Sequence, residues 1–261
     1  MEGVSVTDQT IFKRYELKYL LTPEQLKEVQ AAMRHHMMPD RFFTSTVRSV
    51  YFDTDSYRLI RHSIEQPVYK EKLRLRSYVQ ADADSPVFVE LKKKYQSVVY
   101  KRRIELPLGE AEDWILRGRL PEHSDRLSAG EQQIMREIGY FLDYYQTLAP
   151  AALITCDRKA YMSSEQADLR ITFDSSILAR AYDMSLGGEI GGRALLPDGK
   201  TLMEVKTAGG MPLWLSDVLG RCHIYRSAYS KYGTAYQTIL YPAARGTEWR
   251  TGQKKGEKKY A

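Results

Sequence analysis

Apolar and charged residues alternate along Tyr69–Tyr78, a stretch that reads YKEKLRLRSY. Successive side chains of a β-strand point to opposite faces, so alternation of this kind predicts a strand with one apolar and one ionic face. The ionic face would carry four basic side chains, those of Lys70, Lys72, Arg74 and Arg76. Taken alone, such a strand is most simply explained as a cationic surface strand with its polar face in water.

The same pattern recurs at four other places, at 16–18, 90–92, 170–174 and 204–206, where charged or polar residues two positions apart flank an apolar one. If the apolar faces of these strands pack outward against helices, their ionic faces can line the inside of a barrel. We therefore expect a domain of mixed β and α structure, α+β in class, with antiparallel strands.

Sequence patterns typical of helices lie between the predicted strands. Thr22 can cap a helix whose first turn holds Pro23 and Gln25, and an apolar stripe of helical period continues to Met37, with Pro39 marking the end. A second capping box, Ser128 to Glu131, opens a helix predicted over 128–148. The pattern predicts further helices at 108–117 and 214–232, and strands at 11–21, 46–53, 68–79, 86–94, 97–106, 151–162, 169–175 and 200–207.

We expect three segments: a lead-in over 1–10, one folded domain over 11–241, and a basic tail over 242–261. The tail lacks periodicity, which predicts disorder. It contributes part of the net charge of +6, so that charge indicates an anionic partner only weakly.

The two cysteines have no metal-ligand spacing, and the five histidines form no pair of the H-x-x-x-H kind. No secretory signal or apolar run of the ~18 residues that a membrane-spanning helix needs is present. These features predict a soluble, cytoplasmic protein without an integral membrane segment. Basic runs at 92–94 and 101–103 divide between two strand faces, so we do not expect nucleic acid to bind.

The ionic faces carry more positive than negative charge. Nine basic residues, Arg14, Lys18, Arg74, Arg76, Lys92, Arg158, Arg170, Lys206 and Lys231, would share the interior with four acidic ones, Glu16, Glu90, Asp174 and Glu204. Buried charges without partners are costly, so the missing negative charge has to come from a ligand. Arginine forks and lysine ammonium groups suit phosphate oxygens. Carboxylates in such a pocket can hold Mg²⁺ or Mn²⁺ against phosphate.

These residues resemble those of the triphosphate tunnel metalloenzymes, the CYTH superfamily, and within it the VTC domain, the polyphosphate polymerase domain of the vacuolar transporter chaperone complex. The resemblance covers nearly the whole chain, from about Phe12 to Tyr241. It rests on eight segments in order: Arg14–Tyr19, Tyr51–Thr54, Lys72–Tyr78, Val89–Lys92, Asp157–Tyr161, Arg170–Asp174, Met203–Lys206 and Ser230–Tyr232.

The resemblance implies an eight-stranded antiparallel β-barrel tunnel with surrounding helices and a C-terminal capping helix. It implies that phosphates are bound by Lys18, Arg74, Arg76, Lys92, Arg158, Arg170 and Lys206, with Lys101 a further contact, and we expect Arg14 and Lys231 to bind phosphate as well. Glu204 would be the main ligand of Mn²⁺ or Mg²⁺, with Glu16 and Glu90 beside it. Lys231, on the last helix, would close over the tunnel mouth.

One departure from the wider superfamily concerns the motif E-x-E-x-K, because Arg14 occupies its first acidic position. This change favours binding of a longer phosphate chain over simple two-metal hydrolysis. We expect a metal-dependent ATP:polyphosphate phosphotransferase, in which Glu204, Arg74, Arg76, Arg158 and Lys231 are the catalytic residues. An inorganic triphosphatase and a non-catalytic polyphosphate-binding module remain open. So do the oligomeric state and a separate membrane partner.

Overall fold

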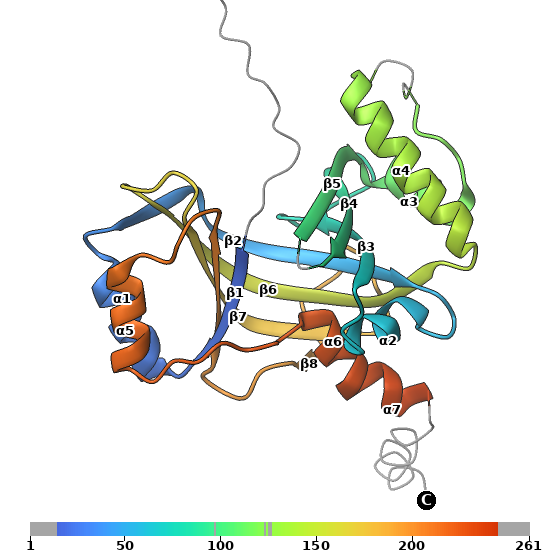
Figure 1. Ribbon diagram of the computed structural model, residues 1–261. Coiled ribbons are helices and arrows are strands. Elements are labelled where there is room, and N and C mark those ends of the chain that lie inside the picture. Colours follow the sequence, from blue (N-terminus) through green and yellow to red (C-terminus); the bar gives the residue numbers. More distant parts are fainter. Residues whose placement is uncertain (1–14, 97, 123, 125–126, 245–261) are drawn as a thin grey trace, which may run out of the picture.

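The computed structural model describes residues 15–96, 98–122, 124 and 127–244. Arg14, the lead-in over 1–10 and the tail after Ala244 lie outside the described residues. Nine strands form a single antiparallel sheet in the order β1-β9-β7-β6-β2-β3-β4-β5, and β8 pairs with β7 outside this path (Figure 1). Their bounds are β1 Tyr15–Leu21, β2 Met37–Asp53, β3 Tyr69–Ser77, β4 Pro86–Tyr95, β5 Val98–Pro107, β6 Ala149–Ser163, β7 Arg170–Arg180, β8 Arg193–Ala194 and β9 Thr201–Thr207.

The helices gather in three groups around the sheet (Figure 1). In chain order they are α1 Pro23–Met33, α2 Arg58–Ile64, α3 Leu108–Arg117, α4 Ala129–Tyr145, α5 Leu213–Arg221, α6 Lys231–Ala235, the π-helical turn η2 Tyr236–Leu240 and α7 Tyr241–Ala244. Both predicted capping boxes are present at the starts of α1 and α4. No helix in the described part of the chain is long and apolar enough to cross a membrane.

The apolar face of β3 packs outward, as the alternation predicts. Leu73 and Leu75 are buried in one apolar cluster with Trp114 of α3 and with Ile138 and Phe141 of α4. A second cluster joins α1 and α5 to the outer faces of β1, β7 and β9. Because helices cover these outer faces, the ionic faces of the same strands are left to the inside of the sheet.

The sheet curls until its two ends approach each other. Lys92 of β4 lies 2.9 Å from Glu16 of β1, although five strands separate β1 from β4 in the sheet order. Strands β1 and β5 form no ladder with each other among the described residues. The expected barrel is therefore correct in its antiparallel strand direction, but the sheet has nine strands rather than eight, and within the described part of the chain no hydrogen-bonded ladder closes it between the two edge strands.

The inner face changes character along the strands. Opposite partners share a face in an antiparallel ladder. Cys156 lies two positions before Arg158 on β6, on the same strand face, and pairs with Val47 of β2. These apolar residues form a third cluster with Tyr232 of α6 and Leu240 of η2. The inner face is thus ionic in one part and apolar in the other, where α6 and η2 pack against it.

Two predicted helices are wrong in their extent. Helix α1 ends at Met33, and Met37 begins β2, a strand that includes Pro39. Met37 nevertheless packs in the same apolar cluster as Val29 and Met33, which explains why the apolar stripe of the sequence extends to it. The strand continues through Pro39 because this end of β2 pairs with the end of β6, where Pro39 lies opposite Tyr161.

The helix predicted over 214–232 is two helices, α5 and α6, separated by an extended segment. His223 has a positive φ, which ends α5. Beyond it, Arg226 forms a bridge with Tyr19, and Ser227 donates its amide to the Lys18 carbonyl at 2.7 Å. The interruption places Lys231 in the first turn of a separate short helix, α6, rather than at the end of a long one.

The sequence patterns did not predict α2. The buried carboxylate of Asp53 at the end of β2 accepts hydrogen bonds from the amides of Leu59 and Ile60 in the first turn of this helix. It also accepts one from the Tyr232 hydroxyl at 2.8 Å. Asp53 therefore ties β2, α2 and α6 together, and burial raises its pKa.

Candidate functional site

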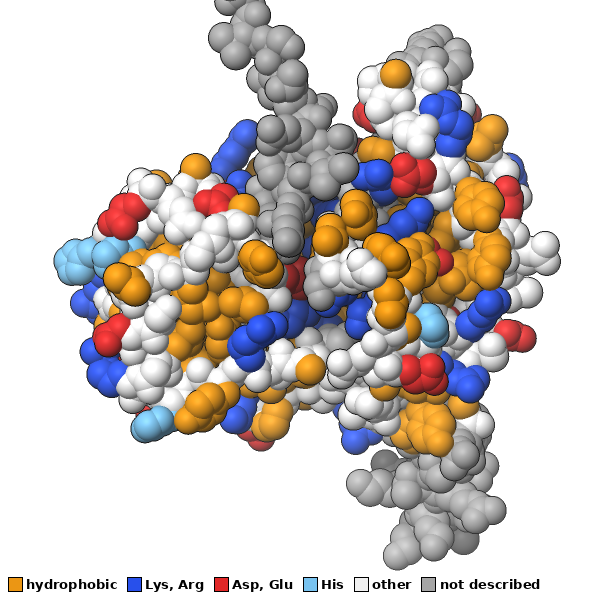
Figure 2. Space-filling view, viewed as in Figure 1, with side chains coloured by type: hydrophobic (Ala, Val, Ile, Leu, Met, Phe, Trp, Pro, Cys, Tyr) orange, Lys and Arg blue, Asp and Glu red, His pale blue; other side chains and the backbone are white. Residues whose placement is uncertain are grey.

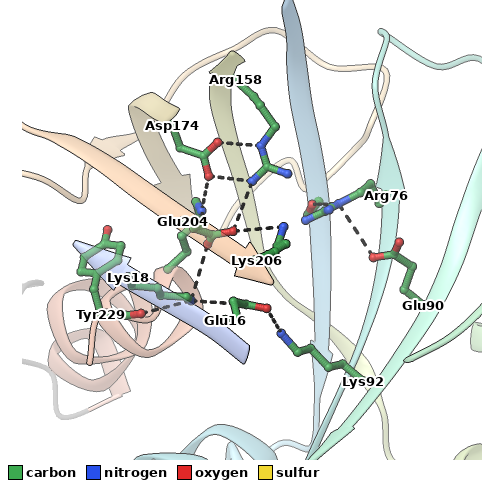
Figure 3. Close-up of polar contacts among 12 residues, drawn as sticks. Glu16, Lys18, Arg76, Glu90, Lys92, Arg158, Asp174, Glu204, Lys206 and Tyr229 are labelled. Atoms are coloured by element: carbon green, nitrogen blue, oxygen red, sulfur yellow. Dashed lines mark hydrogen bonds and ion pairs between the residues drawn. The ribbon is translucent and has the colours of Figure 1, made fainter. Parts of the chain in front are cut away.

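Four carboxylates lie on the inner face of the sheet, one each from β1, β4, β7 and β9. They belong to Glu16, Glu90, Asp174 and Glu204 (Figure 3). The ladder Lys18–Glu204 between β1 and β9, and the ladder Arg158–Asp174 between β6 and β7, place acidic and basic side chains side by side on this face. The charged cluster thus follows directly from the alternation in the sequence.

Glu204 is the centre of the largest group. Its carboxylate lies 3.4–3.8 Å from the basic groups of Lys18, Lys231, Lys206 and Arg158. Burial alone would raise the pKa of Glu204, but these four cations, Lys231 foremost, hold it well below the usual range. Glu204 is therefore ionised at neutral pH and surrounded by more positive charge than it can balance.

Asp174 holds two basic groups that also contact Glu204. Arg158 forms a two-pronged interaction with it, Nε to Oδ1 at 2.6 Å and a second nitrogen to Oδ2 at 2.7 Å. Lys231 Nζ lies 2.5 Å from Oδ2. Burial opposes these contacts, but Lys231 and Arg158 together keep the pKa of Asp174 low. The aspartate fixes both cations at the boundary between the ionic and apolar parts of the inner face.

Glu16 shares Lys18 with Glu204. Each carboxylate has an oxygen 3.5 Å from Lys18 Nζ, and Glu16 also pairs with Lys92 at 2.9 Å. Although burial acts in the opposite direction, Lys92 and Lys18 lower the pKa of Glu16 to about 2.

Glu90 lies on β4, away from the other three carboxylates, and is almost completely buried. Four cations surround it: Arg74 at 2.7 Å, Lys101 at 2.5 Å, Arg103 at 3.7 Å and Arg76 at 3.9 Å. Burial works against the charged form, but Arg74 and Arg76 lower the pKa of Glu90 strongly. We infer that the principal structural effect of Glu90 is to hold arginine forks toward the interior.

Lys231 is held in place by its neighbours along the chain. Ser230 caps α6 by accepting the Gly233 amide. The ring of Tyr232 stacks on Tyr51 with 4.6 Å between centroids. Tyr51 in turn contacts Arg74, its hydroxyl lying 2.9 Å from a guanidinium nitrogen. A continuous chain of contacts therefore connects the segment of Lys231 with Arg74 of β3.

Most of the predicted site residues meet on this face, with two exceptions. Arg170 lies opposite Lys206 in the ladder, but its side chain is 54% exposed and its ion pair, at 3.8 Å, is with Asp40. It stands at the outer end of the ionic face. The predicted phosphate contact at Arg14 falls outside the described residues.

Sequence reasoning missed three residues of the site. Lys72 is on the same strand face as Arg74 and was visible in the alternation, but it was not chosen as a ligand. Arg103 contacts Glu90 and lies over the Phe88 ring, 3.2 Å from its centroid. Tyr51 was seen only as part of a motif, and no sequence signal pointed to its contact with Arg74.

The carboxylates allow a limited test of the predicted metal site. In the described part of the chain, no group of three or more acidic, histidine or cysteine side chains could hold a metal ion. Mg²⁺ is commonly bound by one or two carboxylates together with substrate phosphates. Glu204 and Glu16, which approach the same ammonium group, fit a divalent ion that binds together with phosphate. The structure does not bring Glu90 to this pair.

The surface agrees with an accessible charged interior. Basic side chains gather in the hollow at the centre of one face, with acidic atoms visible beside them (Figure 2). Within the site, Lys92 and Lys101 are the more exposed members, whereas Arg158 and Lys231 are mostly covered. A ligand approaching from solvent would therefore meet Lys92 and Lys101 before Arg158 and Lys231.

Comparison with solved structures supports this architecture. A candidate adenylate cyclase of Bacillus halodurans aligns with a TM-score of 0.50 and 15% identity, covering 84% of this chain and 94% of that chain. A candidate adenylate cyclase of Vibrio parahaemolyticus aligns with a TM-score of 0.45 and 12% identity, over 87% and 98% of the two chains. At these identities the likeness concerns the fold alone, and the second is too weak to carry an argument.

Fold and charged interior together define a domain of the triphosphate tunnel class, to which the CYTH-like structures belong. Residues 13–240 match the family model of the VTC domain, so this chain belongs to the VTC domain family. No curated protein matches the sequence. Membership in this family implies triphosphate or polyphosphate ligands.

Proposed function

We propose that this protein is a polyphosphate polymerase, which transfers the γ-phosphoryl group of ATP to the end of an inorganic polyphosphate chain. One observation carries the proposal: the excess of cations on the inner face. Each of the four carboxylates there is already in contact with two or more basic groups. Desolvated positive charge of this density favours a ligand with several negative charges, and a phosphate chain supplies them at regular spacing.

The proposed reaction needs no protein nucleophile. An oxygen of the terminal phosphate of the acceptor attacks the γ-phosphorus, a new P–O bond forms, and the bond from the γ-phosphorus to the bridging oxygen breaks, leaving ADP. Such transfer depends mainly on positioning and on stabilisation of charge. The forks of Arg74, Arg76 and Arg158 would bind the phosphate oxygens, and Lys231 would offset charge on the transferring group.

Glu204, with Glu16 beside it, would hold the divalent ion. When bound, Mn²⁺ or Mg²⁺ supplies charge neutralisation across neighbouring phosphate oxygens. Enzymes of this superfamily generally depend on a divalent metal. In the structure Glu204 pairs with Lys18, Lys206 and Lys231, so exchange of these cations from carboxylate to phosphate would accompany binding.

The test is purified protein with ATP and Mn²⁺, assayed separately for long-chain polyphosphate, ADP and free phosphate. Polymer together with ADP is the expected result. Free phosphate without polymer, strongest with tripolyphosphate as substrate, would make the protein a triphosphatase. Tight tripolyphosphate binding without turnover would make it a binding module.

Glu204→Gln provides the decisive variant, because it keeps the shape of the side chain and removes its charge. We expect turnover to fall by at least about 100-fold, while tripolyphosphate still binds. Glu28→Gln, an exposed change on α1, is the matched control and should keep wild-type activity. Wild-type turnover in Glu204→Gln would disprove the assignment of the metal ligand.

A further inference from the structure

Lys72 differs from the other lysines of the inner face. Lys18, Lys92, Lys101, Lys206 and Lys231 each lie within 4 Å of a carboxylate. Lys72 has no such partner among the described residues. Its Nζ instead donates a hydrogen bond to the neutral hydroxyl of Ser230, at 3.3 Å.

Among the described residues, the charged groups that act most strongly on Lys72 are all basic. Lys70 and Arg74 flank it on its own strand, Lys92 is its direct partner on β4, and Lys18 approaches from β1. The segment before α6 contributes only the hydroxyl of Ser230. An ammonium group in this position is repelled by these four cations and has no carboxylate within 4 Å among the described residues.

The hydroxyl oxygen of Ser230 already serves as a hydrogen-bond acceptor. Its oxygen accepts the hydrogen bond from Lys72 and another from the Gly233 amide at 3.2 Å. A serine hydroxyl can also donate one hydrogen bond. Because the Lys72 amine and the Ser230 hydroxyl lie 3.3 Å apart, one phosphate oxygen could accept hydrogen bonds from both.

We propose that Lys72 and Ser230 form a further phosphate-binding position, in which the lysine is neutral before the ligand enters and takes up a proton as a polyphosphate chain binds. The proposal rests on the proposed function in one respect, that the ligand is a polyphosphate. The proton moves from solvent, or from a protonated phosphate oxygen, to the amine: an O–H bond breaks and an N–H bond forms. The ligand changes the balance because its negative charge favours the ammonium form.

The electrostatics agree with this assignment. Burial, reinforced by Lys18 and Lys92, lowers the pKa of Lys72 to about 7. The amine is then mostly neutral at pH 8 and mostly charged at pH 6 in the ligand-free protein. The polyphosphate affinity of this position should accordingly be coupled to pH, with tighter binding on the acid side.

The experiment is titration calorimetry with tripolyphosphate in buffers of different ionisation enthalpy, which counts protons exchanged on binding. Lys72→Arg keeps the positive charge but cannot exchange a proton, because arginine does not deprotonate in proteins. At pH 8 the wild type should take up close to one more proton than Lys72→Arg, and at pH 6 the difference should nearly vanish. Comparing the two proteins cancels protons released by the ligand itself.

Lys27→Arg, an exposed change on α1, is the control and should exchange protons like the wild type. Thermal unfolding would first show that both proteins are folded. Equal proton counts for wild type and Lys72→Arg at pH 8 would then overturn the inference and leave the proposed function standing. Failure of the wild type to bind tripolyphosphate would overturn both.

Discussion

Lys92 and Glu16 meet across the gap between the two ends of the sheet, with Nζ and Oε2 2.9 Å apart. One residue comes from the last hairpin of the sheet order and the other from its first strand. With no ladder between β1 and β5 in the described chain, side-chain contacts such as this one help keep the curled sheet together. The pair thus has a structural role beside any role in binding.

Stability should fall in acid because of this pair and its neighbours. The folded-state pKa of Glu16 is lowered to about 2, and those of Glu90, Asp174 and Glu204 are also lowered. A lowered pKa stabilises the fold above the ordinary value near 4.5, and this contribution disappears as the pH falls toward the folded-state value. We expect the free energy of unfolding to drop between about pH 5 and pH 2, measured by urea denaturation.

Glu16→Gln should make this acid loss smaller by on the order of 2 kcal/mol, because the amide does not titrate. Glu28→Gln, on the exposed face of α1, should follow the wild-type curve. Identical curves for Glu16→Gln and wild type would show that the pair across the gap contributes nothing to stability.

Arg74 and Arg170, two arginines of the predicted site that differ in burial, should differ in phosphate affinity. Arg74 is mostly covered, with Glu90 and Tyr51 fixing its fork, whereas Arg170 is mostly exposed at the outer end of the same face. A pre-positioned, desolvated fork binds phosphate more strongly than a hydrated one. Arg74→Met should raise the Kd for tripolyphosphate by roughly 10- to 100-fold, and Arg170→Met by less than about 3-fold.

Calorimetric titration of both variants decides this, with thermal unfolding as the check on folding. A comparable loss in the two variants would mean that the ligand extends to the outer end of the face and that burial does not rank these contacts.

Gly192 is required by the backbone next to β8. It has a φ of +132°, and a Cβ there would collide with the carbonyl group of Ala179. Gly191→Ala is the matched control, since its Cβ would meet its nearest neighbour, an Arg180 nitrogen, at 3.6 Å. Urea denaturation should show Gly192→Ala destabilised by about 2 kcal/mol or more and Gly191→Ala by less than about 0.5 kcal/mol. Equal effects would contradict the close approach of Gly192 to the Ala179 carbonyl.

Local features of the sequence were predictable because their causes are local. Alternation predicted β3, with Leu73 and Leu75 outside and Arg74 inside, since the two faces of a strand require nothing beyond their own residues. Capping boxes predicted where α1 and α4 begin for the same reason. Most of the inward charges followed from these strand assignments, whereas the side chain of Arg170 is mostly exposed.

Features that depend on distant partners were not predictable. Pro39 reads as a helix end, yet the long ribbon of β2 with β6 continues through it. The break between α5 and α6 arises because residues 224–230 pass along β1, with Ser227 bonded to Lys18. The neutral hydrogen-bond partner of Lys72 is Ser230, 158 residues away in the sequence, and no spacing of residues predicts such a contact.

The place of β1 in the sheet has a consequence for how the site comes into being. Among the described strands β1 pairs with one, β9, and Lys18 Nζ contacts the Tyr229 carbonyl across 211 residues of chain. Contacts of such sequence separation form late, because the intervening loop must first be closed. During synthesis, therefore, Glu16 and Glu204 cannot meet until nearly the whole domain has left the ribosome. A nascent chain has no assembled phosphate site, and the protein can bind phosphate only after its last strand and α6 have folded.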